Sequence, residues 1–287
     1  MKPELECGVC LLGWVYGRAI AQNGNLDIPP LFRKLLEFIP EEITDATNLA
    51  FLCNGAVDLI YEFVPAASDF WNEFKKGANA NAMQLHDAAG AYVANGGTAG
   101  ERLERACFLA ATANVAPIGC PSGAFTFPEA VGVIEERLAP PVLVGNPYEA
   151  ARKAKNVLYV TDNAGEVGFD SFLIGMMKEM GAGVTLVVKD PAFFEDVCVE
   201  DATFFGLEDV VDEVVTTDKI FVPGRGDTRV ERAFRASDLL VVKGTGSYES
   251  LMGETRGKKA IYLLKIKCRP LARQTGVGLG GFLVKVA

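Results

Sequence analysis

The sequence predicts an α/β fold, in which a helical N-terminal domain precedes a doubly wound, mostly parallel sheet flanked by helices. Up to about residue 115 the apolar residues recur at helical spacing, and no strand-like alternation occurs. Beyond residue 156, runs rich in Val and Leu alternate with helix-like segments, as in parallel sheets buried on both faces. We therefore expect a helical domain over 1–115 and a Rossmann-like α/β domain over 116–287.

The first part of the chain is expected to hold four helices. Helical spacing predicts the first over Leu5–Gln22. Helix-breaking and helix-capping residues predict the bounds of the other three. One helix is expected to begin at Pro40 and end at Pro65, one to run from Asp69 to about Ala94, and one to follow a capping box of Thr98 and Glu101. Residues 116–126 are rich in Pro and Gly and are expected to form a connection.

The second part alternates helices and strands. Two short helices are expected to begin near Thr126-Phe127-Pro128 and at Asn146-Pro147, because Pro is favoured in the first helical turn. The predicted strands are Val157–Val160, Val184–Val188, Glu213–Thr216, Leu239–Val242 and Ala260–Leu264. The helices expected between them are Glu166–Met180, Val199–Phe205 and Thr228–Arg235.

Composition and charge exclude several classes of function. The chain has 287 residues, 49 % of them hydrophobic, and a net charge of −9. Nucleic acid is not an expected partner, because its phosphates need clustered Lys and Arg. No apolar run reaches the ~20 residues of a membrane helix, and the first residues do not form a signal-peptide pattern. The seven dispersed cysteines do not resemble a secreted disulfide framework, so we expect a cytoplasmic protein.

The turn after the first long strand is the strongest candidate site. Asp162 and Asn163 offer an anionic and a neutral oxygen side by side, which are ligands that hard divalent cations take. The backbone N–H groups that open the next helix favour an anion nearby. The alternative is an ordinary turn in which Gly165 supplies a positive φ.

Polar residues follow the other strands as well. They include Lys189, Asp190 and Asp196 beyond the second strand, Lys243-Gly244 after the fourth, and Lys267 after the fifth. The carboxyl ends of parallel strands share one edge of a sheet, so these side chains should meet in one cleft. Carboxylates, an amide and lysines together indicate metal-assisted phosphoryl chemistry.

Several motifs in a fixed order strengthen this interpretation. DNAGE begins at Asp162, EDA at Glu200, SDLLVVKGTGSYE at Ser237 and LLKIKC at Leu263. This order resembles the damage-control metal-dependent phosphatases, formerly domain of unknown function number eighty-nine. The pair Cys7 and Cys10 is similar to the Cys-x-x-Cys that opens the family's archaeal-type branch.

The resemblance implies roles for particular residues. It makes Asp162, Asn163 and Asp196 the ligands of a divalent metal, and Lys267 the lysine that contacts phosphate. Asp162, Asp196 and Lys267 would then be catalytic. Asn114, Lys243, Gly244, Glu249 and Lys267 would contact the substrate. The sequence departs from the family pattern at Ser247, at Ala116-Pro117 and around Asp196, where Asp-Val-Cys replaces Asp-Ala-Thr.

The implied activity is hydrolysis of a small phosphorylated metabolite, either a sugar phosphate or a phosphopantetheine-like compound, with Mg, Mn, Co or Ni. Asp162 and Asp238 are both candidates for the base that takes a proton from water. Two other functions stay open: an S-adenosylmethionine-dependent carboxyl methyltransferase, and a non-enzymatic binding protein stabilised by metal.

Cys7 and Cys10 have three possible roles. Positions three apart share a face of a helix, so the thiols fit core packing, a second metal site or a redox pair. Cys53, Cys120 or His86 would have to complete such a metal site. We expect a packing or surface role for His86, and core or interface packing for Phe70, Trp71 and Phe74.

Overall fold

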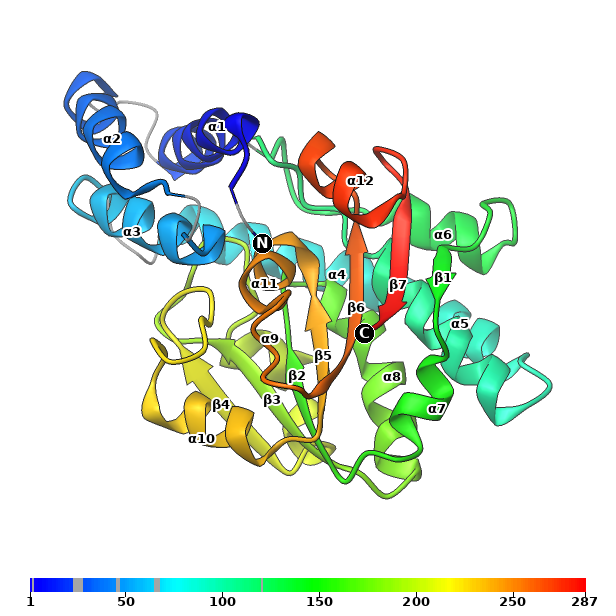
Figure 1. The fold of residues 1–287 in the computed structure, drawn as a ribbon. Coiled ribbons are helices and arrows are strands. Elements are labelled where there is room, and N and C mark those ends of the chain that lie inside the picture. Colours follow the sequence, from blue (N-terminus) through cyan, green and yellow to red (C-terminus); the bar gives the residue numbers. More distant parts are fainter. Residues whose placement is uncertain (2, 23–27, 45–46, 65–67, 120) are drawn as a thin grey trace.

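The structure is a computed structural model that describes residues 1, 3–22, 28–44, 47–64, 68–119 and 121–287. A seven-stranded sheet lies at its centre, in the order β1-β7-β6-β5-β2-β3-β4 (Figure 1). The strands are β1 (Val142–Val144), β2 (Asn156–Val160), β3 (Gly183–Lys189), β4 (Glu213–Thr217), β5 (Leu239–Lys243), β6 (Lys259–Lys265) and β7 (Phe282–Val286).

The sheet is mostly parallel. In its centre Val157 of β2 is in register with Val184 of β3 and with Leu239 of β5, and both pairings are parallel. β4 and β6 continue the parallel array on the two sides. β7 reverses direction against β6, and β1 then pairs with β7 in parallel. The α/β class with a mostly parallel sheet is therefore confirmed.

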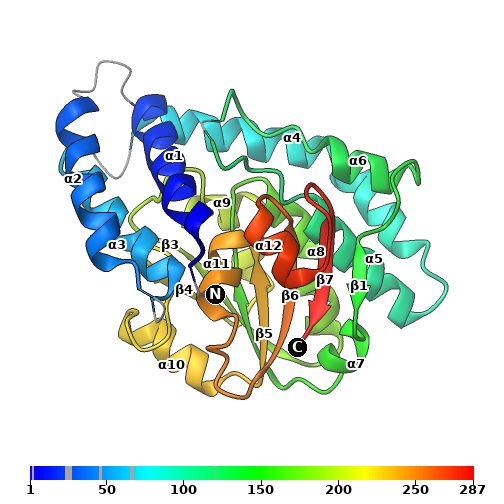
Figure 2. The ribbon, with the colours of Figure 1, turned by 45° about the horizontal axis from the view of Figure 1, so that its top comes forward.

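Helices cover both faces, because successive residues of each strand point to opposite sides. On β2, Val157 and Tyr159 pack in one core with helices α4, α5 and α8, whereas Leu158 and Val160 pack in a second core with α10 and α11. Figure 2 shows α10, α11 and α12 on the near face, with α5 and α8 behind the sheet. Burial on both faces explains the continuous Val and Leu runs.

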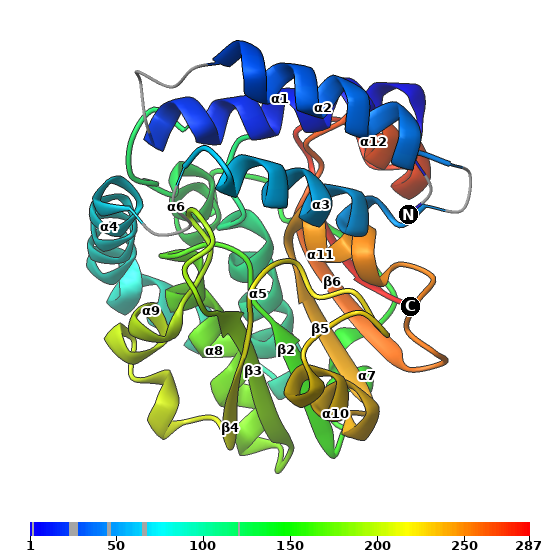
Figure 3. The same cartoon turned by 90° about the vertical axis from the view of Figure 1, so that its left-hand side faces the viewer.

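The N-terminal helices close one end of the sheet. They are α1 (Leu5–Gln22), α2 (Ile28–Glu42), α3 (Leu49–Tyr61), α4 (Asp69–Ala94) and α5 (Ala99–Thr112). Figure 3 shows α1, α2 and α3 above the sheet, at the end toward which β5 and β6 point in Figure 1. None of the helices in the described residues has the length and apolar character needed to cross a membrane.

The helices between the strands are mostly short. They are α6 (Pro128–Ile134), α7 (Pro147–Ala151), α8 (Glu166–Glu179), α9 (Val199–Phe204), α10 (Thr228–Ala236), α11 (Gly244–Leu251) and α12 (Arg269–Thr275), with a 3₁₀ turn at Leu207–Asp209. Asn146 caps α7 as expected, by accepting a hydrogen bond from the Glu149 N–H at 2.9 Å. Thr98 and Glu101 form the predicted capping box of α5.

Two local predictions were wrong, and several elements were not predicted. Pro40 lies in the last turn of α2 rather than opening a helix, and the next helix begins after Asn48, whose side chain accepts from the Ala50 N–H at 3.0 Å. Thr126 does not cap α6, because Phe127 occupies the N-cap in a left-handed conformation. The edge strands β1 and β7 and the helices α2, α11 and α12 were not predicted.

The missed helix α2 has a clear signal. Leu31, Leu35 and Ile39 recur every four residues and are all buried. The proposed domain boundary near residue 115 stays a prediction, and Val57 of α3 and Val157 of β2 belong to the same apolar core. Pro65 and Cys120 lie outside the described residues.

Candidate active site

A pocket of about 160 Å³ lies where the carboxyl ends of β2 and β5 meet. These strands are neighbours, but β2 continues to β3 on one side and β5 to β6 on the other, so their following loops diverge and leave a crevice. Residues of α1, α3 and α12 form the opposite wall. Five residues predicted from the sequence line this pocket: Asp162, Asn163, Asp196, Glu249 and Lys267.

The loops after β2 and β3 pair with each other. Asn163 and Asp196 form an isolated antiparallel bridge, and the Val197 N–H donates to the Asp162 carbonyl at 2.9 Å. This pairing places Asp196 beside the Asp162-Asn163 turn. Asp190, the other carboxylate expected beyond the second predicted strand, is exposed and does not line the pocket.

Hydrogen bonds orient the amide of Asn163. Its Nδ2 donates to Asp162 Oδ2 at 2.8 Å and to Glu166 Oε1 at 2.7 Å, and its Oδ1 accepts no hydrogen bond from the described residues. Asp196 is paired with Lys189 at 3.4 Å. Burial raises the pKa of Asp196 well above its usual range, Lys189 opposes this shift, and the nearby Asp162 adds to it.

This donor set fits a hard divalent cation. Asp162 and Asp196 bring two carboxylates together, and the Asn163 Oδ1 adds a neutral oxygen, which are the ligand types that Mg²⁺ and similar ions take. The mutual repulsion of two close carboxylates is relieved by a cation between them. Within the described residues, no group of three or more His, Cys, Asp or Glu side chains could hold a metal, and this site includes an amide instead.

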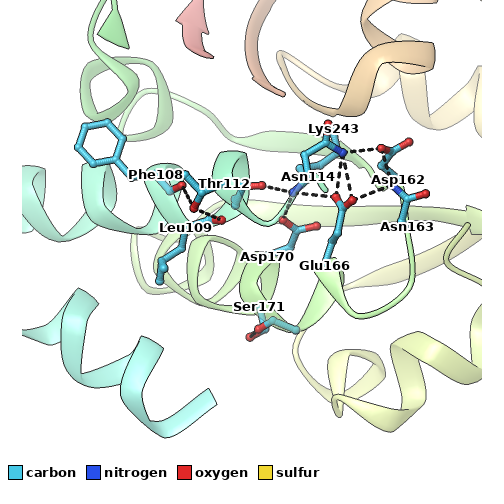
Figure 4. Close-up of polar contacts among 12 residues, drawn as sticks. Phe108, Leu109, Thr112, Asn114, Asp162, Asn163, Glu166, Asp170, Ser171 and Lys243 are labelled. Atoms are coloured by element: carbon cyan, nitrogen blue, oxygen red, sulfur yellow. Dashed lines mark hydrogen bonds and ion pairs between the residues drawn. The ribbon is translucent and has the colours of Figure 1, made fainter. Parts of the chain in front are cut away.

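Asn114 lies beside Asp162 and Glu166 (Figure 4). Its Nδ2 donates to Asp162 Oδ2 at 2.7 Å and to both carboxylate oxygens of Glu166 at 3.1 Å, and its Oδ1 accepts from the Lys265 N–H at 3.2 Å. The side chain is fully buried. Asn114 therefore connects the turn after β2, the first turn of α8 and the end of β6, and it holds the Asp162 carboxylate in place.

Lys243, the last residue of β5, ends in a buried group of charges. Its Nζ lies 2.8 Å from Asp170 Oδ1 and 3.5 Å from Glu166 Oε2, and donates to the Ala110 carbonyl. Burial alone lowers the pKa of Lys243, but the Asp170 and Glu166 carboxylates raise it above its usual value. Burial raises the pKa of Glu166 to about 8, with Lys243 opposing the shift.

Asn114 and Lys243 do not line the pocket. The roles predicted for them, as contacts of the substrate, stay predictions. Their hydrogen bonds and ion pairs instead hold Asp162 and Glu166 from the buried side, away from the pocket. The geometry therefore gives Asn114 and Lys243 a positioning role.

The start of α11 forms another part of the wall, but Gly244, a predicted substrate contact, does not itself line the pocket. Gly244 has φ +75° and begins the helix, whose N-cap residue Lys243 makes no side-chain cap. Thr245, Gly246 and Ser247 line the pocket. Thr245 Oγ1 is buried without a hydrogen-bond partner among the described residues. The first N–H groups of a helix lack intrahelical partners, so they are available to an anion here.

Lys267 reaches the pocket from the segment after β6. Among the residues that the structure describes, it makes no hydrogen bond or ion pair within 4.0 Å. Burial lowers its pKa, while Asp162 and Glu166 act in the opposite direction. An ammonium without a fixed partner, close to two carboxylates, is available to a ligand's negative charge.

Sequence reasoning missed a buried ion pair in the pocket wall. Arg18 of α1 pairs with Glu195, donates to the Ile118 carbonyl at 3.3 Å, and lies 4.2 Å from the ring of Trp14. Arg18 and Glu195 are each 2 % exposed. An arginine in the otherwise apolar run Trp14–Ile20 was the available signal, because isolated charges on a buried helix face are paired.

Four cysteines line the wall opposite the strand ends: Cys7 and Cys10 from α1, Cys53 from α3, and Cys268 before α12. All four are free thiols. Burial raises the pKa of Cys10 to about 12 and also raises that of Cys268. The three roles considered for the Cys7 and Cys10 pair stay predictions.

The remaining candidates lie away from the pocket. Asp238 precedes β5, where it accepts from the Lys155 N–H at 3.0 Å, so it lies at the opposite edge of the sheet. The His86 ring stacks on Phe172 with centroids 4.6 Å apart, in agreement with a packing role. Trp71 is fully buried, as expected for a core residue.

Comparison with known proteins identifies the family. The chain matches the damage-control phosphatase ARMT1-like domain over residues 19–283. The chain belongs to this family. The resemblance drawn from the motifs is thereby confirmed.

One archaeal relative in the comparison covers the whole chain, and another covers about half of it. A damage-control phosphatase of Archaeoglobus fulgidus is 27 % identical over 100 % of this chain and 99 % of its own length. A damage-control phosphatase of Pyrococcus horikoshii is 34 % identical over 47 % of this chain and 48 % of its own. The crystal structure of a DUF89 family protein from P. horikoshii has the same fold, with a TM-score of 0.78, 24 % identity and 99 % coverage of both chains.

Proposed function

We propose that this protein is a divalent-metal-dependent phosphatase acting on a small phosphorylated metabolite. The observation that carries the proposal is the meeting of Asp162, Asn163, Asp196 and the unpaired Lys267 in one pocket. Family membership supports it, because relatives over much of the chain are named damage-control phosphatases.

Asp162, Asn163 and Asp196 would hold Mg, Mn, Co or Ni through oxygen. When bound, such an ion supplies a Lewis acid for phosphate oxygens and lowers the pKa of a water ligand. The pairing of the loops after β2 and β3 keeps these three side chains together before the ion arrives. The protein therefore contributes a preorganised donor set rather than one assembled by the metal.

The phosphate would be held by two further features. The Lys267 ammonium neutralises one oxygen, and the N–H groups of Thr245 and Gly246 at the start of α11 face another. The Thr245 hydroxyl, unpaired in the described residues, adds one donor. Donors placed where charge develops stabilise the transition state more than the ground state.

Asp162 is our choice for the residue that accepts the proton of the attacking water. Its Oδ2 is engaged by Asn114 and Asn163, whereas its Oδ1 accepts no hydrogen bond from the described residues. Water attacks phosphorus and gives a proton to Asp162, the bond from phosphorus to the ester oxygen breaks, and the leaving oxygen then takes that proton and departs as the alcohol. Asp238 lies at the far edge of the sheet and does not support this role.

The organic part of the substrate would extend toward α1. Leu11 and Trp14 provide an apolar surface there, and Glu249 and Ser247 provide polar groups. Both a sugar phosphate and a phosphopantetheine-like ester fit this mixture, so both belong in the test panel.

The experiment measures phosphate release from a panel of phosphomonoesters. The protein is stripped with a chelator and then resupplied separately with Mg²⁺, Mn²⁺, Co²⁺ or Ni²⁺. Asp196→Ala is compared with Asp190→Ala, which removes a neighbouring carboxylate outside the pocket. We expect metal-restored release that Asp196→Ala abolishes and Asp190→Ala retains.

Other results would point elsewhere. Loss of release in Asp190→Ala alone would move the third ligand to Asp190. No release with any metal or ester would contradict the proposal. S-adenosylmethionine binding would then test the methyltransferase alternative, and unfolding on chelation without turnover would favour a metal-stabilised binding protein.

A further inference from the structure

Asn79 of α4 connects the two loops that carry the proposed metal ligands. The side chain is 4 % exposed, and both of its polar atoms are bonded. Its Oδ1 accepts from the Gly165 N–H at 2.7 Å, and its Nδ2 donates to Asp201 Oδ1 at 2.7 Å. Gly165 ends the turn that begins with Asp162, and Asp201 lies in the first turn of α9, just after Asp196.

On the first side, Asn79 holds the N-cap residue of α8 through that residue's own N–H. Gly165 is the N-cap residue of α8, has φ +77° and offers no side chain to the first N–H groups. A Cβ at this position would lie 2.7 Å from the Ala78 carbonyl, so the backbone of α4 packs directly against the turn. Helix α4 therefore fixes the height of the Asp162-Asn163 turn above the sheet.

On the second side, Asp201 holds the start of α9 through hydrogen bonds that its carboxylate accepts. Its Oδ2 accepts from the Cys198 N–H at 2.9 Å and from Lys75 Nζ at 3.1 Å. Lys75 also donates to Cys198 Sγ at 2.6 Å. Lys75, Asn79 and Asp201 are all at most 4 % exposed, so these bonds are shielded from water.

We propose that Asn79 is a positioning residue that sets the separation between Asp162-Asn163 and Asp196, and hence the affinity for the metal. It touches neither the pocket nor the proposed ligands. Outer partners that orient metal ligands change metal affinity by about 10- to 100-fold when they are removed. The inference rests on the metal site of the proposed function.

One substitution separates the two bonds of Asn79. Asn79→Asp keeps an oxygen for the Gly165 N–H but loses the donor to Asp201 and sets two carboxylates against each other. Combining it with Asp201→Asn restores the bond with its direction reversed, because Asn at 201 donates to Asp at 79. The exchanged pair also keeps the net charge beside Lys75.

Asn81 provides the matched control. It lies two residues along the same helix, and its Nδ2 donates to the Phe125 carbonyl at 2.9 Å, away from the loops of the site. Asn81→Asp makes the same chemical change on α4 without touching Gly165 or Asp201.

The test measures Mn²⁺ affinity by equilibrium titration of the chelator-stripped full chain, with no substrate present. Thermal unfolding of each metal-free variant is recorded in parallel. We expect Asn79→Asp to weaken Mn²⁺ binding at least tenfold, the exchanged pair to recover to within about threefold of wild type, and Asn81→Asp to bind as wild type.

Three results would overturn the inference. They are wild-type Mn²⁺ affinity in Asn79→Asp, equal weakening in Asn81→Asp, or no recovery in a folded exchanged pair. The exchanged pair also decides the question if Asn79→Asp does not fold. Failure of the underlying metal site has a separate signature, since wild type would then bind no Mn²⁺ or Asp162→Ala would bind it normally.

Discussion

Gly244 leaves room for the carboxylate of Asp162, because a Cβ on residue 244 would overlap Asp162 Oδ2 and Cγ. The two residues follow the neighbouring strands β5 and β2. Gly244 also has φ +75°, a conformation that side chains with a Cβ rarely adopt. The close approach of these strand ends therefore depends on the absence of a side chain at one of them.

Gly244→Ala should displace the Asp162 carboxylate and reduce phosphate release at least 100-fold, because a misplacement of about 1 Å costs that much. The measurement is kcat with the best metal and ester of the panel. Gly253→Ala is the control, since Gly253 has φ +90° but open space around its Cα. Both variants should lose about 1–2 kcal/mol of stability from the left-handed φ. Equal activity in the two would contradict the steric argument.

Lys243→Met should destabilise the protein by about 3–5 kcal/mol, because it leaves Asp170 and Glu166 buried without their cation. The free energy of unfolding from urea titration measures the loss. Lys76→Met, which removes an ion pair of exposed side chains, should leave stability almost unchanged because solvent screens the pair. A similar small effect at Lys243 would show that the buried charges are not coupled.

Glu249 should make stability depend on pH. Burial raises its pKa from 4.5 to about 7, with the N-terminal ammonium opposing. The folded chain then keeps this proton while the unfolded chain releases it, so stability falls as pH rises from about 4.5 to about 7. Each pKa unit corresponds to about 1.4 kcal/mol, so the rise from 4.5 to about 7 sets an upper limit of about 3.5 kcal/mol.

Glu249→Gln removes this contribution. The variant should match wild type near pH 4.5 and exceed it in stability by up to about 3.5 kcal/mol at pH 8, as measured by urea unfolding at both pH values. Glu254→Gln changes an exposed carboxyl nearby and should show no such difference. A stability gap that does not grow with pH would refute the assignment.

The centre of the fold was predictable from the sequence because its signals are local. Strand β2 carries a continuous apolar run that ends at Val160, two residues before Asp162, and α5 begins at a capping box. The edge strands carry weaker signals: β1 has three residues, and β7 follows a glycine-rich turn. Their pairing is decided by contacts with β6 and with each other, which no local pattern encodes.

The sequence indicated which residues gather around the candidate site, but not which of them line the pocket and which lie buried behind it. Because residues that follow parallel strands share one edge of the sheet, Asp162 and Lys267 were expected in one pocket. The same argument cannot distinguish Lys267, which lines the pocket, from Lys243, which is fully buried. Asn79 and Arg18 were missed because they act across more than eighty residues of sequence. A polar residue on the buried face of an apolar helix was the only available signal.

Lys267→Gln should raise KM for the phosphate ester about 10- to 100-fold, because the charge-assisted bonds to a phosphate oxygen are lost. Burial lowers the pKa of Lys267, so this side chain loses its proton and its charge at a lower pH than an ordinary lysine does. The KM of wild type should therefore rise with pH as that charge is lost. The variant has no charge to lose at this position, so its KM should not show this rise. Initial rates from pH 6 to 10 measure both effects. Lys265→Gln is the matched control, because Lys265 pairs with Glu129 at 2.6 Å and does not line the pocket. An unchanged KM in Lys267→Gln would leave the start of α11 as the phosphate-binding element and remove Lys267 from the site.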